Sequence, residues 1–501
     1  MKGCIVLQRR FAPIGHAIAL ELKNKYEVNE FCGYVIARNA EYFAKSRKDI
    51  VYTHLLMDED LRNRSKKEKL DIEYLKRIES EYGFPNLWPF IAIDRTLMMD
   101  IPRKEYSISP APPYTHEEML KILQIKFREI IKFLKKERPD FIIGVNVGSI
   151  GAMILYYVAK KEGIKFYTAE NAKIGNRITF SDDYKTLSGM ENIFTDIRKR
   201  NYESPNRKEA ERFLKRFRDN PEPPAFAIEE KENGRWEKIA SLPLKFLRSL
   251  SFTIKSVILY AKNPRKEDMT TENPFFLFRN KLIRKIRGLR NLQALYDAVD
   301  LKEDFAYFPL HFEPEITTLL YAPFYTDQIN LIRQIAKSLP IHFKIYVKEH
   351  PSMLEYRPTE YYRELKKIPN LKLINPKQSS LDLIKNSKMI VTISGTAGFE
   401  ASLLKKPVIT FGDIFYNCLS FVKKCGPIEE LPNLVKKQLE NFQYDEKEMV
   451  DFLSALFEDT TALDLSNAWG SGDGNQLEAM VKQPEFHKFV ASLAHKLNLK
   501  N

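Results

Sequence analysis

The chain has 501 residues, 44% of them hydrophobic and 29% charged, which suits about two or three globular domains and excludes a chain that is disordered throughout. Its four cysteines are too few for a disulfide scaffold and fit a reducing compartment. Lysine and arginine (80) outnumber aspartate and glutamate (66), and the net charge of +14 favours polyanionic partners such as nucleic acid, anionic lipid or phosphorylated substrates.

Neither a targeting segment nor a membrane span is expected. The apolar stretch 4–7 is too short for a signal peptide, and Arg9 and Arg10 follow it closely. The longest uncharged run, 141–159, approaches the length of a transmembrane helix, but polar residues and three glycines interrupt it. We interpret this run as a buried strand, a turn and a helix.

The first 200 residues predict alternating strands and helices. This alternation is typical of a parallel sheet covered by helices on both faces. Thr115 and Glu118 have the spacing of a capping box at the start of one helix. The strands are expected at 4–7, 141–147 and 164–168, with a further apolar segment that includes 35–36, and the helices at 16–25, 69–82, 116–137 and 149–162.

Residues 201–300 interrupt the alternation and predict a basic helical connector or insertion. Asn-Pro pairs at 263–264 and 273–274 break regular structure there. Between Pro243 and Arg290, 12 basic residues accompany three acidic ones, so this stretch carries +9 of the net charge.

The alternation returns in residues 301–460, which predict a second Rossmann-like domain, and 461–501 predict a C-terminal helical tail. The fold class is therefore α/β, with two doubly wound domains facing a cleft at the carboxyl ends of their strands, where such sheets bind ligands. The strands are expected at 306–309, 343–347, 371–374, 389–393 and 407–411, and the helices at 325–338, 360–367, 380–386, 396–404, within 428–459, and at 476–498.

The strongest candidate site lies in this second domain. Lys348 and His350 follow a predicted strand, and Ser394-Gly395-Thr396 forms a strand-to-helix turn further along. Small residues in such a turn let the backbone approach a phosphate, whose charge the helix amides then receive. Glu400, one turn into the helix, is a candidate acceptor for ribose hydroxyls. The alternative interpretation is ordinary turn chemistry, with a threonine helix cap and a histidine packed in a loop.

Five sequence runs in this region resemble the capsule polysaccharide biosynthesis family, which comprises GT-B-like glycosyltransferases and includes bacterial Kdo transferases. The resemblance covers about 305–416, and the runs are FPLHFEPE from Phe308, VKEHP from Val347, SSLDLI from Ser379, SGTAGFEA from Ser394 and KPVITFG from Lys406. It implies nucleotide binding by His350, Ser394, Gly395 and Thr396, and nucleoside contacts from Glu313 and Glu400.

The first domain then has to supply the acceptor site and a base. His16, which directly follows the expected loop after the first strand, and Asp182 are the two candidates for the base. Glu170 and Arg177 are candidates for binding the acceptor, because an arginine can hold a phosphate or an acidic sugar. The alternative is that His16 is a solvated helix-terminal residue and that 170–183 is a polar loop.

A metal site is not expected. Asp58-Glu59-Asp60 matches the D-x-D pattern with which another glycosyltransferase fold binds metal, but no flanking strand is evident and we interpret it as a helix start. The cysteines lack the spacing of zinc ligands. We therefore expect catalysis without a metal ion or cofactor.

Together these features predict a metal-independent, inverting glycosyltransferase of surface polysaccharide synthesis, with a nucleotide-sugar donor and a glycan or glycolipid acceptor. One alternative is a polyol-phosphate transferase of the teichoic-acid type, which has a similar fold. The other is a non-catalytic polyanion-binding protein. Nucleic acid is not an expected partner, because no nucleic-acid-binding motif is recognisable.

The sequence also predicts a cytoplasmic protein whose residues 243–290 dock on the inner face of an anionic membrane. Basic residues near an anionic leaflet contribute about 1 kcal/mol each, and the interleaved aromatic side chains are suited to the headgroup region. The alternative is that the apolar residues pack on the two domains while the charges face solvent or bind an anionic acceptor.

Overall fold

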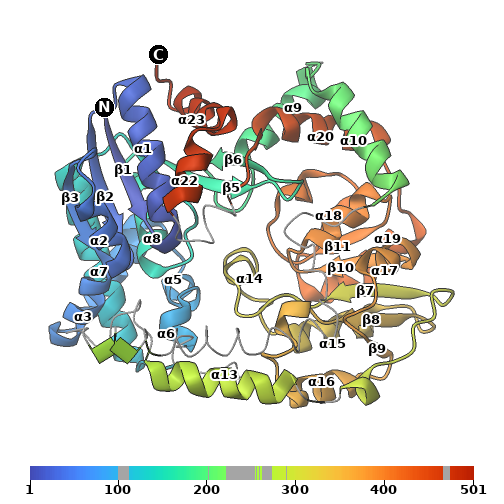
Figure 1. The fold of residues 1–501 in the computed structure, drawn as a ribbon. Helices are drawn as coiled ribbons and strands as arrows, with labels where there is room; N and C mark the ends of the chain where they lie inside the picture. The colour runs from blue at the N-terminus through green and yellow to red at the C-terminus, as the bar shows by residue number, and fades with distance from the viewer. Residues whose placement is uncertain are drawn as a thin grey trace.

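The computed structural model describes residues 1–99, 112–200, 202–221, 273–288, 290, 292–465 and 474–500, together with a few positions between 254 and 261. Two separate β-sheets with helices packed around them form the molecule (Figure 1). The first half of the chain builds six of the seven strands of one sheet, to which residues 461–462 add the seventh, and residues 305–424 build the other sheet.

The first sheet has seven strands in the order β13-β6-β5-β4-β1-β2-β3. The five strands from β5 to β3 are parallel, whereas β6 and β13 run antiparallel to their neighbours. Buried apolar side chains fill β1 and β4, as expected for strands with helices on both faces. The bounds are β1 Lys2–Leu7, β2 Glu30–Val35, β3 Tyr52–Met57, β4 Phe141–Gly144, β5 Lys165–Asn171, β6 Arg177–Ser181 and β13 Thr461–Ala462.

The second sheet has six parallel strands in the order β12-β11-β10-β7-β8-β9. Both sheets thus share the strand order 3-2-1-4-5 of a doubly wound fold, and this confirms the predicted fold class. In the second sheet the order reverses between β7 and β10. The bounds are β7 Phe305–Pro309, β8 Lys344–Lys348, β9 Leu371–Ile374, β10 Met389–Thr392, β11 Val408–Thr410 and β12 Val422–Lys424.

Helices connect and cover the strands. In the first half these are α1 Ala12–Tyr26, α2 Arg38–Ser46, α3 Asp58–Arg64, α4 Ile72–Tyr82, α5 Trp88–Ala92, α6 Arg95–Met99, α7 His116–Glu137, α8 Ile150–Lys161, α9 Ser188–Arg200 and α10 Arg207–Asp219. In the second half they are α13 Pro274–Gly288, α14 Ile316–Tyr321, α15 Gln328–Ser338, α16 Thr359–Lys366, α17 Ser380–Asn386, α18 Thr396–Leu403, α19 Leu431–Glu440, α20 Glu446–Asp459, α22 Gly474–Val481 and α23 Pro484–Lys496. The predicted capping box at Thr115 and Glu118 is confirmed.

Two local predictions were wrong, and so was one of the alternatives. The expected loop 11–15 is already helical from Ala12 onward, because Pro13 in the first turn of α1 favours an early helix start. The strand expected to reach 147 ends at Gly144. The segment 170–183, for which a polar loop was the alternative, belongs largely to a β-hairpin of β5 and β6, whose turn includes Gly175 at a φ of 51°.

The structure also has a strand directly before the D-x-D pattern, where none was evident from the sequence. β3 ends at Met57, and α3 begins directly at Asp58, so the helix start is confirmed while the absence of a strand is not. Asp58 is buried and accepts hydrogen bonds from Tyr34 and, at 2.8 Å, from the Lys126 ammonium.

The two sheets are joined by packing at several points. In Figure 1, α14 lies between the two sheets, and Leu319 and Leu320 belong to the same buried apolar cluster as Val147 and Ile150, which follow β4. Helices α9 and α10, although early in the chain, pack on α20. The last residues return to the first sheet, where β13 pairs with β6 and α23 packs on α1.

Among the residues that the structure describes, no helix is both long and apolar enough to span a bilayer. The uncharged run 141–159 divides into β4 and most of α8, as the sequence predicted.

Candidate functional site

The carboxyl ends of three adjacent strands bring the second-domain candidates together. β7 lies between β10 and β8, so the turn after β10 and the loop after β8 flank the loop after β7. Ser394-Gly395-Thr396 follows β10, and Lys348 ends β8 with His350 just beyond it. This edge is the point where the strand order reverses, which is where doubly wound sheets bind ligands.

The turn after β10 leads into α18 with an open amino terminus. Gly395 is the N-cap residue, and no side chain caps the first amides of the helix. The Tyr416 hydroxyl donates a hydrogen bond to the Gly395 carbonyl at 2.6 Å and so fixes the turn. A side chain at position 395 would meet Thr392 Oγ1 at 2.8 Å, so only glycine fits here without displacing its neighbours.

Ser394 supplies a hydroxyl at the same turn. Its Oγ is buried and has no hydrogen-bond partner among the described residues. Because a buried hydroxyl without a partner costs free energy, such a group suits a ligand that supplies the missing acceptor or donor. The uncapped amides of α18 and this hydroxyl together form an arrangement that fits an anionic oxygen.

His311, which the sequence analysis did not single out as a site residue, connects the two neighbouring loops. Its Nε2 accepts from the Ser394 amide at 3.3 Å and lies 3.2 Å from Thr392 Oγ1, which itself accepts from the Gly395 amide at 3.1 Å. Nε2 is therefore unprotonated. Burial, and then the nearby charge of Arg357, lower the pKa of His311 to about 4.

The loops after β7 and β8 are held together by one wholly buried arginine. Arg357 donates from Nη1 to both carboxylate oxygens of Glu349, at 2.5 and 2.7 Å. From Nη2 it donates to the His311 carbonyl at 2.7 Å and to Glu313 at 2.9 Å. Glu349 also accepts from Tyr362 and from the His350 amide, so this carboxylate orients the start of the His350 loop.

Lys348, the last residue of β8, and Glu400, in α18, are both buried. Lys348 donates to the Gln378 carbonyl at 2.6 Å and to Ser380 Oγ at 2.7 Å. Burial raises the pKa of Glu400 to about 7, and the charge of Lys348 opposes this shift only in part. Glu400 therefore titrates near neutral pH.

His350 is exposed at the edge of the site. Its Nδ1 accepts from the Ser352 amide at 3.3 Å, and its ring packs edge-on against Phe312 at 6.0 Å between centroids. These two contacts fix the orientation of the ring beside the loop that carries His311.

The first-domain candidates do not converge on one point. His16 Nε2 lies 2.9 Å from Asp49, and Nδ1 lies 3.1 Å from the Tyr52 hydroxyl, so partners within its own domain engage both ring nitrogens. Burial lowers the pKa of His16, although Asp49 opposes the shift. Asp182 is exposed directly after β6.

Glu170 and Arg177 have different surroundings. Burial raises the pKa of Glu170 to about 7, with Thr168 and Lys173 opposing, and Glu170 is near enough to Tyr321 of α14 to raise the pKa of that hydroxyl. Arg177 instead donates to Thr460 Oγ1 at 2.8 Å and to the Phe457 carbonyl at 3.0 Å, where it caps the end of α20.

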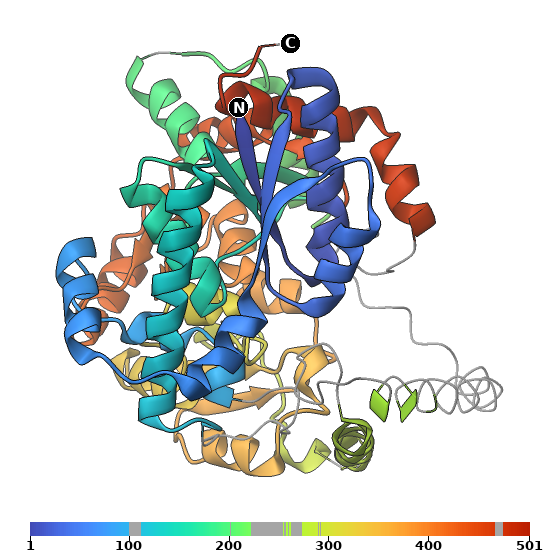
Figure 2. The same ribbon diagram turned by 90° about the vertical axis from the view of Figure 1, so that its left-hand side faces the viewer.

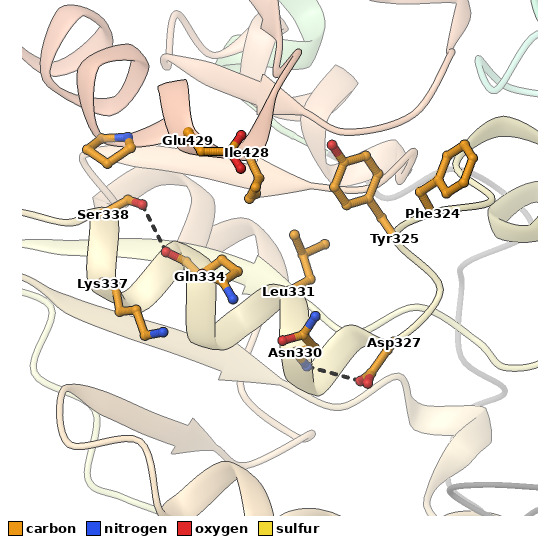
Figure 3. A pocket seen from close by; sticks show the side chains of 11 residues that line it. Phe324, Tyr325, Asp327, Asn330, Leu331, Gln334, Lys337, Ser338, Ile428 and Glu429 are labelled. Carbon is orange, nitrogen blue, oxygen red and sulfur yellow. Dashed lines mark hydrogen bonds between the residues drawn. The ribbon is translucent and has the colours of Figure 1, made fainter.

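No metal cluster coincides with these residues in the described part of the chain. No group of three or more His, Cys, Asp or Glu side chains with metal-site geometry occurs there. A shallow groove of 630 Å³ runs between α15 and the start of α19 (Figure 3). Its lining, which includes Phe324, Asn330 and Glu429, is separate from the turn after β10.

A known protein family matches the part of the chain that contains this edge of the second sheet. The model of the family described as "Capsule polysaccharide biosynthesis protein" matches residues 321–432. This match contains Lys348, His350 and the turn at 394–396, and it confirms the resemblance found in the sequence.

One curated relative covers a part of the chain. Protein FixF of Sinorhizobium fredii (strain NBRC 101917 / NGR234) is 31% identical over 140 residues, which are 26% of this chain and 32% of that protein. The chain thus matches about a third of the length of this relative.

Several solved structures are similar at low identity. Thermosulfurimonas dismutans KpsC, beta Kdo 2,7 transferase, is 13% identical with a TM-score of 0.37, covering 74% of this chain and 89% of that one. The beta Kdo 2,4 transferase of the same protein is 14% identical with a TM-score of 0.35, covering 69% and 88%. UDP-GlcNAc 2-epimerase from Methanocaldococcus jannaschii is 16% identical with a TM-score of 0.26, covering 91% and 98%.

Removing the buried arginine should destabilise the second domain. Arg357→Met leaves the Glu349 carboxylate buried without its cation, and we expect the free energy of unfolding to fall by about 3–5 kcal/mol. The matched control is Arg363→Met, which removes an exposed arginine paired with Glu360 and should cost at most about 0.5 kcal/mol. Urea denaturation measures both, and equal losses would contradict the role assigned to Arg357.

His311 should make stability depend on pH. Its pKa is about 4 when folded, against an ordinary value of 6.5, so the unfolded chain binds the extra proton between these two values. Stability from neutral His311 is therefore complete above pH 6.5 and is lost as the pH falls toward 4, by on the order of 3 kcal/mol.

The comparison with His311→Gln isolates this contribution. The variant keeps an acceptor for the Ser394 amide but does not titrate. The pH dependence of stability that comes from Glu170 and Glu400 is the same in both proteins and cancels in the comparison. We expect the stability difference between wild type and variant to shrink between pH 7.5 and pH 4.5. A difference that does not change with pH would show that His311 is not held neutral.

Proposed function

We propose that the protein is a glycosyltransferase that binds a nucleotide-sugar donor at the carboxyl edge of its second sheet. The observation that carries the proposal is the uncapped amino terminus of α18 beside the unpartnered Ser394 hydroxyl, at the point where the strand order reverses. The capsule polysaccharide biosynthesis family match over the same residues supports it. The product would belong to a surface polysaccharide or a glycolipid.

The donor phosphates would lie on the amides of Thr396 and Ala397, with Gly395 leaving room for them and with the hydroxyls of Ser394 and Thr396 as further ligands. His350 would approach the phosphates from the neighbouring loop. Glu400 and Lys348 would lie next to the nucleoside. Glu313, which its ion pair with Arg357 holds in place, would lie there too. In this arrangement the leaving phosphate is stabilised by helix amides and by cationic or hydrogen-bonding side chains, and the transfer needs no metal ion.

The first domain would bind the acceptor and take up the proton of its attacking hydroxyl. Glu170 is the best placed of the first-domain candidates, because a carboxyl with a pKa near 7 can accept a proton at neutral pH and because it lies near Tyr321 of the second domain. The paired ring nitrogens make His16 a weaker candidate, and Asp182 ranks after Glu170 because it is exposed. We propose direct displacement, hence inversion at the anomeric carbon.

The nucleotide site is tested by binding. Wild-type protein is screened for thermal stabilisation by CMP, UDP, GDP and CDP, since a ligand of the folded state raises apparent stability. His350→Ala and Thr396→Ala should each weaken binding of the selected nucleotide by about 1–3 kcal/mol. His342→Ala is the matched control, because this exposed histidine precedes β8 at the opposite end of the strand. Unchanged affinity in both site variants would contradict the assignment.

The transfer itself is tested with the corresponding nucleotide-sugars and product analysis. A glycosidic product formed equally in EDTA supports the proposal, whereas a phosphodiester product identifies a polyol-phosphate transferase. Glu170→Gln should abolish product formation and leave the nucleotide affinity unchanged, because it removes the proton acceptor only. Full activity of this variant would exclude Glu170 as the base.

A further inference from the structure

Large apolar side chains on the surface are concentrated in one short part of the chain. Of the 16 that the structure describes as exposed, seven lie between residues 254 and 286. Four of these are on α13 and three precede it: Phe275, Phe278, Leu282 and Ile286 on the helix, and Ile254, Val257 and Ile258 before it. Isolated exposed apolar residues are common, but a contiguous group marks an interaction surface.

The four apolar residues of α13 form a single stripe. Their spacing of three, four and four residues places them along one side of the helix. Phe275 is 67% exposed, Phe278 63%, Leu282 48% and Ile286 57%. Lys281 and Lys285 are also exposed and flank this stripe. We call these six residues the α13 face.

The charge of α13 restricts what can cover this face. The helix contains five basic residues and no acidic one. Within a protein surface of mixed charge, such a helix favours an anionic partner. A basic helix whose apolar stripe contains two phenylalanines is the pattern of a helix that lies in the interface of an anionic bilayer.

Arginines on the inner side fasten α13 to the second domain. Arg284 donates to the Tyr356 hydroxyl at 2.7 Å and stacks on its ring, with 4.7 Å to the centroid, and Arg287 donates to the Tyr356 carbonyl. Beyond the helix end, Arg290 donates to Thr359 Oγ1 and to the Arg357 carbonyl, each at 2.9 Å. These contacts turn the α13 face away from the domain.

The position of α13 leaves its outer side accessible. The helix lies along the outer edge of the molecule, at the bottom of Figure 1, and Figure 2 shows it end-on beside the body of the protein. Tyr356, which holds it, contacts Phe312, and Phe312 contacts His350. The α13 face therefore has a fixed relation to the loop of the candidate site.

We propose that the α13 face docks on an anionic lipid bilayer, with the four apolar side chains entering the headgroup boundary and Lys281 and Lys285 contacting lipid phosphates. A bilayer-bound acceptor would then reach the protein from the side on which α13 lies. The docking does not depend on the proposed glycosyl transfer, because it uses none of the residues assigned to nucleotide or proton transfer.

Vesicle flotation of the full chain tests the docking. Wild-type protein should float with phosphatidylglycerol-containing vesicles and not with pure phosphatidylcholine vesicles, and the binding should weaken in high salt. The double variant Lys281→Glu/Lys285→Glu should lower the partition coefficient more than about tenfold, since one basic residue is worth about fivefold. Phe275→Ser/Phe278→Ser should lower it to a similar extent, because two buried aromatic side chains are lost from the headgroup boundary. Thermal unfolding of each variant verifies that it is folded.

Matched controls change the same chemistry elsewhere. Phe324→Ser/Ile341→Ser removes two fully exposed apolar residues, and Lys436→Glu/Lys437→Glu reverses two exposed lysines of α19. Both controls should float like wild type. The proposal is overturned if wild-type protein does not float, if it binds neutral vesicles equally well, or if the controls lose binding as strongly as the α13 variants. It is also overturned if Phe275→Ser/Phe278→Ser abolishes a dimer in light scattering without affecting flotation, because a second copy would then be the partner.

Discussion

The buried pair of Arg357 and Glu349 is the interaction on which the candidate site depends. An arginine excluded from water has to satisfy its charge inside the protein, and it does so through Glu349, Glu313 and the His311 carbonyl. These partners belong to the loops after β7 and β8, so one guanidinium sets the distance between the two loops. Burial and, second to it, the same charge keep His311 neutral, and this lets its Nε2 accept from the turn after β10.

This chain of contacts extends from the second sheet toward the first. The loop that carries His311 and Glu313 continues into α14, whose Leu319 and Leu320 share an apolar cluster with first-domain residues. Arg95 of α6 donates to the Pro314 carbonyl at 3.3 Å, and Lys185 pairs with Asp413 at 3.1 Å. A proposed donor on one sheet and a proposed acceptor on the other would thus be aligned by packing that starts next to the nucleotide site.

Much of the second domain was predictable from its sequence. Its strands are buried on both faces, so they appear as apolar runs, and the small residues at 394–396 mark the turn into α18. The roles of His311 and Arg357 were not predictable, because they depend on which strands are neighbours in the sheet. A pattern of apolar residues also does not show that a charged residue such as Arg357 is buried. His311, by contrast, lies within a run that resembled the family.

The structure of the first domain was harder to predict from the sequence, for a different physical reason. β6 is a short strand near the sheet edge with polar residues at both of its ends, so it has the composition of a loop. Its pairing with β5 moves Arg177 to the end of α20, where the guanidinium satisfies helix carbonyls. The α1 helix begins four residues earlier than expected and places His16 against Asp49. In both cases tertiary contacts determine what a polar side chain does, and the local sequence does not reveal them.

Hydrogen exchange with and without CMP, UDP, GDP or CDP at saturating concentration would show whether a nucleotide binds at the second sheet. We expect one nucleotide to slow exchange in peptides covering 348–353 and 393–399, because phosphate oxygens would accept from the amides at the start of α18. Peptides covering 145–152, at the corresponding edge of the first sheet, should be unaffected. Protection confined to 145–152, or no protection by any of the four nucleotides, would contradict a nucleotide site on the second sheet.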